Sequence, residues 1–154
     1  TDEKEDPKLV EELHKISKER GAQAVTLCSK LEAEIAQLGP EDRAMFMQDL
    51  GLKESGLQKV IVAAYKLLGQ CSYFTCGPIE VRAWTITSGW KAPQAAGVIH
   101  TDFEKGFIKA DIYGFKDIDQ HLKESALREK GMIRSEGKDY VVADGDVCFF
   151  KFAN

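Results

Sequence analysis

Apolar residues in the first half of the chain recur every three or four positions, which is the spacing of amphipathic helices. The first such run, residues 7–20, begins after Asp6 with Pro7, a pair typical of an N-cap and a first helical turn. Gly21 follows it as a typical helix stop. The same spacing predicts further helices at residues 31–38, 41–50 and 55–68.

Residues 22–28 separate two of these helices with a short, almost wholly apolar run. Such a run is typical of a strand that is buried on both faces, usually in a parallel sheet. A parallel strand needs neighbours, and the first half of the chain supplies no other strand. We therefore expect this part to be the last piece of a larger α/β sheet.

In the second half, strand patterns replace the helical spacing. Residues 71–76 and 81–87 are rich in strand-forming residues and are joined by Gly77-Pro78, which predicts a hairpin. Pro93 then presets φ for a helix that should end near Asp102.

The remaining elements also follow from periodicity. Residues 107–113 alternate as a strand, and residues 117–130 have the spacing of a helix. Runs at 140–142 and 147–152 flank Asp144-Gly145, a dipeptide that predicts a hairpin with Gly145 at positive φ. The residues expected to face inward are Ile108, Ala110 and Ile112 on the strand, and Ile118, Leu122 and Ala126 on the helix.

The order in the second half is thus strand, strand, helix, strand, helix, strand, strand, as in a β-grasp (ubiquitin-like) fold. The expected fold class is α+β, with a β-grasp domain preceded by a mainly helical segment that contains one buried strand.

Composition and charge narrow the functional classes. The chain has 154 residues, 44% of them apolar and 30% charged, which is typical of a globular protein. The net charge of −4 gives no overall attraction to nucleic acid, so any such binding needs a local basic patch. No apolar run is long enough to span a bilayer, so no membrane partner is expected. Because the chain has no overall positive charge, DNA is not an expected partner either. The polar acidic start without methionine predicts a fragment or a processed chain.

The cysteines do not predict a metal site. They are scattered without a CxxC pair, and no histidine lies at ligand spacing, so we expect buried free thiols in a reducing cytosol and no metal. The four positions are Cys28, Cys71, Cys76 and Cys148.

Long stretches of the chain carry a family resemblance. The strings RAWTI, APQAAG and HTDFEKGFI lie between Val81 and Tyr113, and GAQAVTLCSKLEAEIAQL and GLQKVIVAAYKLLG precede them. Over nearly its whole length the chain resembles the C-terminal part of the YchF (Obg-like) ATPases. The resemblance implies a tail of a P-loop NTPase domain at residues 1–39, a helical connector at 40–70 and a TGS domain at 71–154.

The chemistry of such an ATPase is missing from the chain. The sequence contains no G-x-x-x-x-G-K-[ST] loop to cradle phosphates or to supply a hydroxyl for Mg²⁺. The family's Asn-x-x-Glu motif would lie just ahead of Thr1; Asp2 and Glu3 are near its acidic position, but no asparagine precedes them. We expect no catalytic residue and no cofactor in this chain, with ATP and Mg bound only by the intact parent.

One element of the nucleotide pocket is nevertheless expected. The resemblance implies that the loop Cys28, Ser29, Lys30 and Leu31 approaches the base in the intact parent. Ser29 and Glu32 also have the spacing of a capping box for the following helix. The two roles are compatible.

Isolated histidine and tryptophan residues suggest structural or binding roles. His100 lies near Asp102 without a suitably placed nucleophile, so a structural role is expected. Trp84, within an apolar strand, is expected in the core. Trp90, in a turn, is the better candidate for an exposed aromatic that stacks on a base.

The stretch from Arg82 to Lys109 has a basic excess, with four Lys or Arg against two acidic residues. A solvated mixed surface is one interpretation, and an RNA contact, which the TGS resemblance favours, is the other. The candidate residues for binding RNA or another partner are Arg82, Trp90, Lys91, Lys105 and Lys109.

The resemblance implies that this chain is the regulatory and binding end of a cytoplasmic, ribosome- or RNA-associated ATPase. The resemblance implies that the parent hydrolyses ATP in preference to GTP. Two alternatives stay open: a ubiquitin-like protein-interaction module with no RNA role, and an enzyme in its own right. An exposed sheet face lined by apolar rather than basic residues would favour the interaction module.

Overall fold

The computed structural model describes residues 6–77 and 79–153. It contains two compact units, the described residues up to Leu68 and those from Gly69 onward, which we call the helical unit and the sheet unit. The expectations for Asp2, Glu3 and Pro78 lie outside the described residues.

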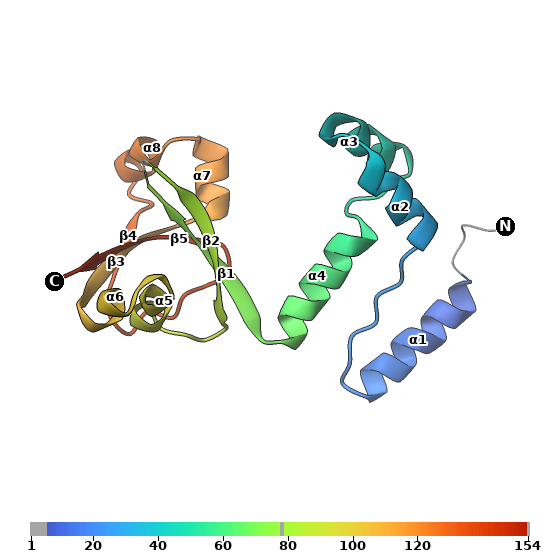
Figure 1. Cartoon of the computed structure of the whole chain (residues 1–154), viewed down its shortest axis with the longest axis horizontal. Helices are drawn as coiled ribbons and strands as arrows, with labels where there is room; N and C mark the ends of the chain where they lie inside the picture. Colours follow the sequence, from blue (N-terminus) through green and yellow to red (C-terminus); the bar gives the residue numbers. More distant parts are fainter. Residues whose placement is uncertain (1–5, 78, 154) are drawn as a thin grey trace. The chain divides into compact units, whose positions relative to one another are not determined.

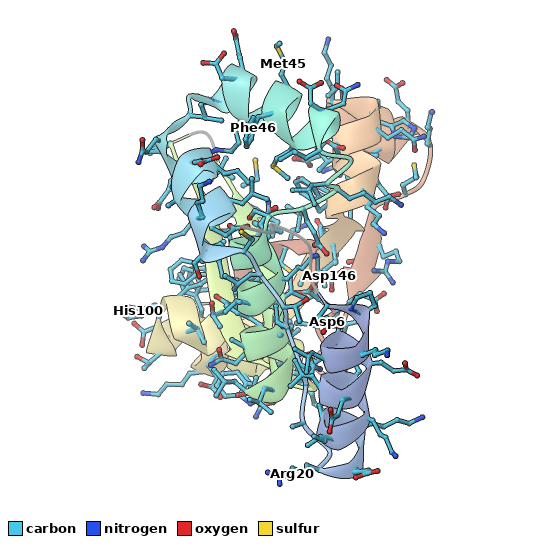
Figure 2. The ribbon with its side chains drawn as sticks, turned by 90° about the vertical axis from the view of Figure 1, so that its right-hand side faces the viewer. Asp6, Arg20, Met45, Phe46, His100 and Asp146 are labelled. Carbon is cyan, nitrogen blue, oxygen red and sulfur yellow. The ribbon has the colours of Figure 1, made fainter. Side chains whose placement is uncertain are left out.

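The helical unit consists of α1 (Pro7–Glu19), α2 (Ser29–Gln37), α3 (Pro40–Asp49) and α4 (Gly56–Leu67) (Figure 1). All four predicted helices are confirmed, with ends that shift by a residue or two. Asp6 caps α1, since its Oδ1 accepts a hydrogen bond from the N–H of Lys8 at 3.0 Å. Figure 2 shows Asp6 and Arg20 at the two ends of this helix.

Residues 22–28, predicted as a strand of a larger sheet whose other strands this chain does not supply, form neither a helix nor a strand in the structure. A strand exists through the hydrogen bonds to its neighbour, and no second extended segment lies in the described part of the helical unit. An apolar run of this length therefore stays an unpaired connection between α1 and α2.

The helical unit has little core of its own. Ile35 is the only fully buried apolar side chain in its described residues. The predicted apolar stripe of α4 exists as a pattern, yet it is mostly exposed, at Leu57, Val60, Ile61, Leu67 and Leu68.

The sheet unit contains a five-stranded mixed sheet in the order β2-β1-β5-β3-β4. The hairpin β1–β2 is confirmed, with Cys76 opposite Val81, and β1 and β5 are parallel with Phe74 beside Val147. The predicted α+β, β-grasp fold is therefore confirmed. The strands are β1 (Gln70–Cys76), β2 (Val81–Thr87), β3 (Phe107–Gly114), β4 (Arg134–Glu136) and β5 (Asp146–Phe152).

Two short helices replace the single one predicted after Pro93. α5 (Ala92–Ile99) ends at His100, whose backbone is extended, and α6 (Thr101–Lys105) begins directly after it. The Nδ1 of His100 accepts a hydrogen bond from the N–H of Asp102 at 3.1 Å, so this histidine caps α6. The expected structural role of His100 is confirmed.

The helix predicted at residues 117–130 is also divided, into α7 (Phe115–His121) and α8 (Glu124–Glu129). Leu122 lies between them in the left-handed region at φ 59°, which ends α7. Its side chain is 80% exposed, so the prediction that Leu122 faces inward is wrong. Leu127 is the buried leucine, and Ile118 packs beside it as predicted.

The predicted C-terminal hairpin is wrong, although β5 is confirmed. Residues 140–142 form no strand; Val141 makes a single bridge to Lys91, and the N–H of Val142 donates to the carbonyl of Trp90 at 3.0 Å. The long-range contact with the turn before α5 thus prevails over local hairpin pairing. The strand that joins the sheet is β4, which pairs with β3 rather than β5. The positive φ predicted for Gly145 is confirmed at 83°.

A bulge in β3 changes its predicted alternation. The register with β5 shifts between Phe107 and Lys109, so Phe107 takes the inner position at 3% exposure while Ile108 is 55% exposed. Ala110 and Ile112 face inward as predicted, whereas Ile108 does not.

The sheet buries side chains on both faces. The larger cluster, around Tyr73, Ile112 and Phe150, also contains the alanines of α5. The smaller cluster, with Tyr113, Leu127 and Val147, lies under α7 and α8 (Figure 1). Part of this second face is left uncovered and forms a candidate binding surface.

Candidate functional site

The loop expected near the base in the intact parent, residues 28–31, lies at the start of α2, and we call it the base-side loop. Cys28 is the N-cap residue, and Ser29, Lys30 and Leu31 form the first helical turn. The predicted capping box is wrong, because α2 has no side-chain cap and Ser29 lies inside the helix. Glu32 instead accepts hydrogen bonds from another helix, at 2.6 Å from the N–H of Gly56 and at 3.2 Å from that of Leu57.

These residues do not make a phosphate site. Binding a nucleotide triphosphate needs a glycine-rich loop whose N–H groups surround the phosphates, and the sequence contains no such loop. The chain's own residues therefore do not fit Mg·ATP, and no catalytic step can be assigned to them.

The predicted basic residues do not share one surface. Arg82 alternates with Trp84 and Ile86 on the face of the larger core cluster, whereas Lys109 projects from the opposite face, one position from buried Ala110. Lys91 forms an ion pair with Asp139, with 2.7 Å between Nζ and Oδ1. Lys105 is the last residue of α6.

One of the two tryptophans lies in the environment that the sequence predicts, and the other does not. Trp84 packs against the larger cluster as predicted, and its Nε1–H donates to the Thr75 hydroxyl at 2.9 Å. The guanidinium of Arg82 lies over the Trp84 ring, 4.2 Å from its centre. Trp90, predicted as the exposed aromatic, is half-buried against the same cluster and offers only part of its indole to solvent.

The uncovered part of the second face combines apolar and charged side chains, and we call it the open sheet face. Val81 is 69% exposed and Phe149 is 57% exposed. The members, from four adjacent strands, are Cys76, Val81, Ala83, Lys109, Asp111, Phe149 and Lys151.

Lys151 was missed by the sequence analysis. It lies opposite Lys109 across β3 and β5, and its ammonium forms an ion pair with Asp111 at 2.6 Å. This hydrogen bond holds the pKa of Asp111 below its usual range. Only the register of two strands far apart in the sequence brings the two lysines together, so no local signal could have identified the pair.

A second polar cluster fixes the loop between β4 and β5. The Tyr140 hydroxyl donates to Asp146 Oδ2 at 2.8 Å, and the same oxygen accepts from the N–H of Ala143 at 2.9 Å. Arg134 lies over the Tyr140 ring and 3.9 Å from Asp146. Burial, with the hydrogen bond to Asp146, raises the pKa of Tyr140 to about 12. This cluster is structural, because each polar group is used to hold the loop.

The cysteines are free thiols with different exposure. Cys71 and Cys148 are buried, and burial raises the pKa of the Cys148 thiol well above its usual range. Cys76, on the open sheet face, is exposed, contrary to the expectation of buried thiols.

Residues 6–77 and 79–153 contain no cluster of His, Cys, Asp and Glu that could hold a metal ion. In the same ranges, no helix is both long and apolar enough to cross a membrane.

Comparison with known proteins identifies the family of the sheet unit. A family profile described as "YchF-GTPase_C: Protein of unknown function (DUF933)" matches residues 70–153. Those residues span β1 to the C-terminal end of β5, and so the whole β-grasp sheet.

Named relatives match over both units. The "Ribosome-binding ATPase YchF" of Escherichia coli O157:H7 is 52% identical over 93% of this chain and 39% of its own length. The protein of the same name from Bacillus subtilis is 46% identical over 98% of this chain and 42% of its own. A solved structure, "Structure of the Schizosaccharomyces pombe YchF GTPase", superposes with a TM-score of 0.76 at 38% identity, covering 94% of this chain and 38% of that one.

The chain spans about two fifths of the length of the curated relatives it matches. The profile match covers more than half of the chain and coincides with a complete folded unit. The chain belongs to the YchF family and carries that family's C-terminal domain.

Proposed function

We propose that this chain is the ribosome-binding and regulatory portion of a YchF-type, Obg-like P-loop ATPase. In this proposal the sheet unit is a TGS module that contacts ribosomal RNA, and the chemistry belongs to a nucleotide domain outside this chain. The observation that carries the proposal is the 52% identity, over 93% of the chain, to a protein named a ribosome-binding ATPase.

The intact protein is proposed to be cytoplasmic, to bind ATP with Mg²⁺ and to hydrolyse ATP in preference to GTP. The loop Cys28–Leu31 would then lie beside the base, at the start of α2. The phosphates and the metal would be held elsewhere, because this chain has no phosphate loop.

For the RNA contact, the lysines of the open sheet face are the first candidates. Lys109 and Lys151 are cross-strand neighbours; Lys151 forms an ion pair with Asp111, and Lys109 is the exposed cation beside that pair. Lys105, Arg82, Lys91 and Trp90 are proposed as secondary contacts. Lys91 already forms an exposed ion pair with Asp139, and Trp90 is half-buried against the larger cluster, so substituting Trp90 would also disturb packing.

The test is the salt dependence of binding to ribosomes and to single-stranded ribosomal RNA. Each phosphate contact on a single strand should contribute a log–log slope of about −0.7 through counterion release. We expect Lys109→Glu and Lys105→Glu to weaken binding and to flatten the slope by about one contact each.

Matched controls come from α1. Lys15→Glu and Lys18→Glu make the same charge change on the exposed surface of the helical unit. They should leave both affinity and slope unchanged. Equal effects of all four reversals would indicate that only net charge matters, and would contradict a specific contact.

The apolar part of the open sheet face supports a second candidate, a ubiquitin-like protein-interaction module. Val81, Phe149 and Cys76 are exposed side by side on adjacent strands. Under this alternative, ribosome binding would be independent of salt and would survive Lys109→Glu, but it would be lost on Phe149→Asp. The outcome of the salt titration therefore distinguishes the two candidates.

A further inference from the structure

The N-terminus of α4 is capped twice, from two different helices. Its own residues form a capping box: Gln58 Oε1 accepts from the N–H of Ser55 at 2.8 Å, and Ser55 Oγ accepts from that of Gln58 at 3.2 Å. The N–H groups between them, of Gly56 and Leu57, donate to Glu32 at 2.6 and 3.2 Å. All the free donors at the start of this helix are thereby satisfied.

Glu32 is not needed to start α4, since the capping box already does so. It is a residue of α2 that lies 24 positions before Gly56 in the sequence. Both carboxylate oxygens are used, and a negative charge at a helix N-terminus is favoured by the helix dipole. The contact is therefore a tie between two helices rather than a local cap.

Packing around this tie is close. A Cβ added to Gly56 would lie 2.6 Å from the Cβ of Leu27 and 2.9 Å from Oε1 of Glu32, so only glycine fits there. Ile35, the buried apolar residue of the described helical unit, lies one turn further along α2. Because the described part of the unit has so little apolar core, few apolar contacts hold α4 against α2, and the hydrogen bonds of Glu32 matter more.

We propose that Glu32 is a latch that ties the base-side loop and α2 to α4, and that it transmits movement of the loop to the connection with the sheet unit. α4 ends at Leu67, and β1 begins at Gln70, so α4 leads directly into the sheet. The part of the proposal that concerns nucleotide rests on the proposed function, in which the loop lies at the base. The latch itself rests only on the contacts of Glu32.

The first experiment tests the latch in the whole chain by amide hydrogen exchange. With Glu32→Ala, exchange at Gly56 and Leu57 should accelerate by about tenfold or more, since hydrogen bonds to a charged group are lost. Glu32→Gln, which keeps one acceptor oxygen, should have an intermediate effect. Glu34→Gln, on the exposed side of the same helix, is the control and should change nothing. Unchanged exchange at both amides in Glu32→Ala would overturn the latch.

The second experiment tests transmission in the full-length protein, with Mg·ADP as the probe. We expect Mg·ADP to slow exchange across α4 in the wild type. Glu32→Ala should bind Mg·ADP with less than a threefold change in affinity and yet lose this response. A wild-type protein that binds Mg·ADP without a response in α4, or a variant that keeps the response, would overturn transmission while leaving the proposed function intact. A wild type that binds no nucleotide would overturn the proposed function together with transmission, and the first experiment would still decide the latch.

Discussion

Individual residues with unusual backbone geometry mark the ends of elements in the sheet unit. Gly145 has φ 83°, its N–H donates to the carbonyl of Ser72, and its carbonyl accepts from the N–H of Phe115, both at 2.8 Å. It therefore connects β1, α7 and the start of β5 through the backbone alone. Glycine is favoured here because φ is positive and not because space is short, since an added Cβ would meet nothing closer than 3.9 Å.

Gly145→Val should destabilise the chain by about 1–3 kcal/mol, because a β-branched residue is strained at positive φ. The matched control is Gly137→Val, where φ is not positive and the added Cβ has open space. Urea unfolding of the two variants measures the difference. Equal free energies of unfolding would show that the φ of Gly145 is not a constraint.

Side-chain partners at the residue scale could be predicted only when they are local. The capping of α1 by Asp6 depends on neighbouring residues and was predicted. Glu32 has the right spacing to pair with Ser29, but its partners are Gly56 and Leu57, which become neighbours only after α3 reverses the chain. The pairing of Lys109 with Lys151 was hidden for the same reason.

Elements were predictable where periodicity alone decides them. The four helices of the helical unit and the hairpin β1–β2 follow from spacing and turn residues. The failures involve long-range contacts: residues 22–28 have no partner strand, and residues 140–142 bond to the turn before α5 instead of β5. The division at Leu122 has no signal in the 3.6-residue period, because leucine is a good helix former.

Two tyrosines, Tyr140 in the loop between β4 and β5 and Tyr113 in β3, should make the sheet unit sensitive to alkali. Burial raises the pKa values of Tyr140 and Tyr113 to about 12 each, from 10.0 for an ordinary tyrosine. As the pH rises, these phenols therefore ionise in the unfolded chain before they ionise in the folded chain. The stability that the neutral phenols contribute is present below about pH 10 and is lost as the pH rises towards 12. Urea unfolding at several pH values above 9 should show this fall.

Tyr140→Phe isolates the contribution of this loop. The variant should be less stable near neutral pH, because Asp146 loses the hydroxyl that donates to it, yet its stability should fall less steeply above pH 10. An alkaline slope identical to that of the wild type would contradict the assignment to Tyr140.

At the scale of the whole molecule, the chain combines a β-grasp sheet with a helical unit whose described residues bury little apolar surface. The resemblance noted in the sequence is confirmed at family level by the profile match and by relatives that cover both units. The basic candidates could not be assembled from the sequence, since strand alternation places Arg82 and Lys109 on opposite faces.

The chain by itself should not bind nucleotide. It has no phosphate loop, and the residues expected near the base cannot hold phosphates. Isothermal titration with Mg·ATP into the millimolar range should give no saturable heat. Saturable binding would mean that the chain contains a nucleotide site other than a phosphate loop.

The central claim, that this chain carries ribosome binding separately from nucleotide chemistry, is tested most directly by cosedimentation. The purified chain is titrated against salt-washed 70S ribosomes, with and without Mg·ATP. The account predicts saturable pelleting that weakens with added salt and is the same in both series. Pelleting no greater than that of the chain alone, or pelleting that requires Mg·ATP, would contradict it.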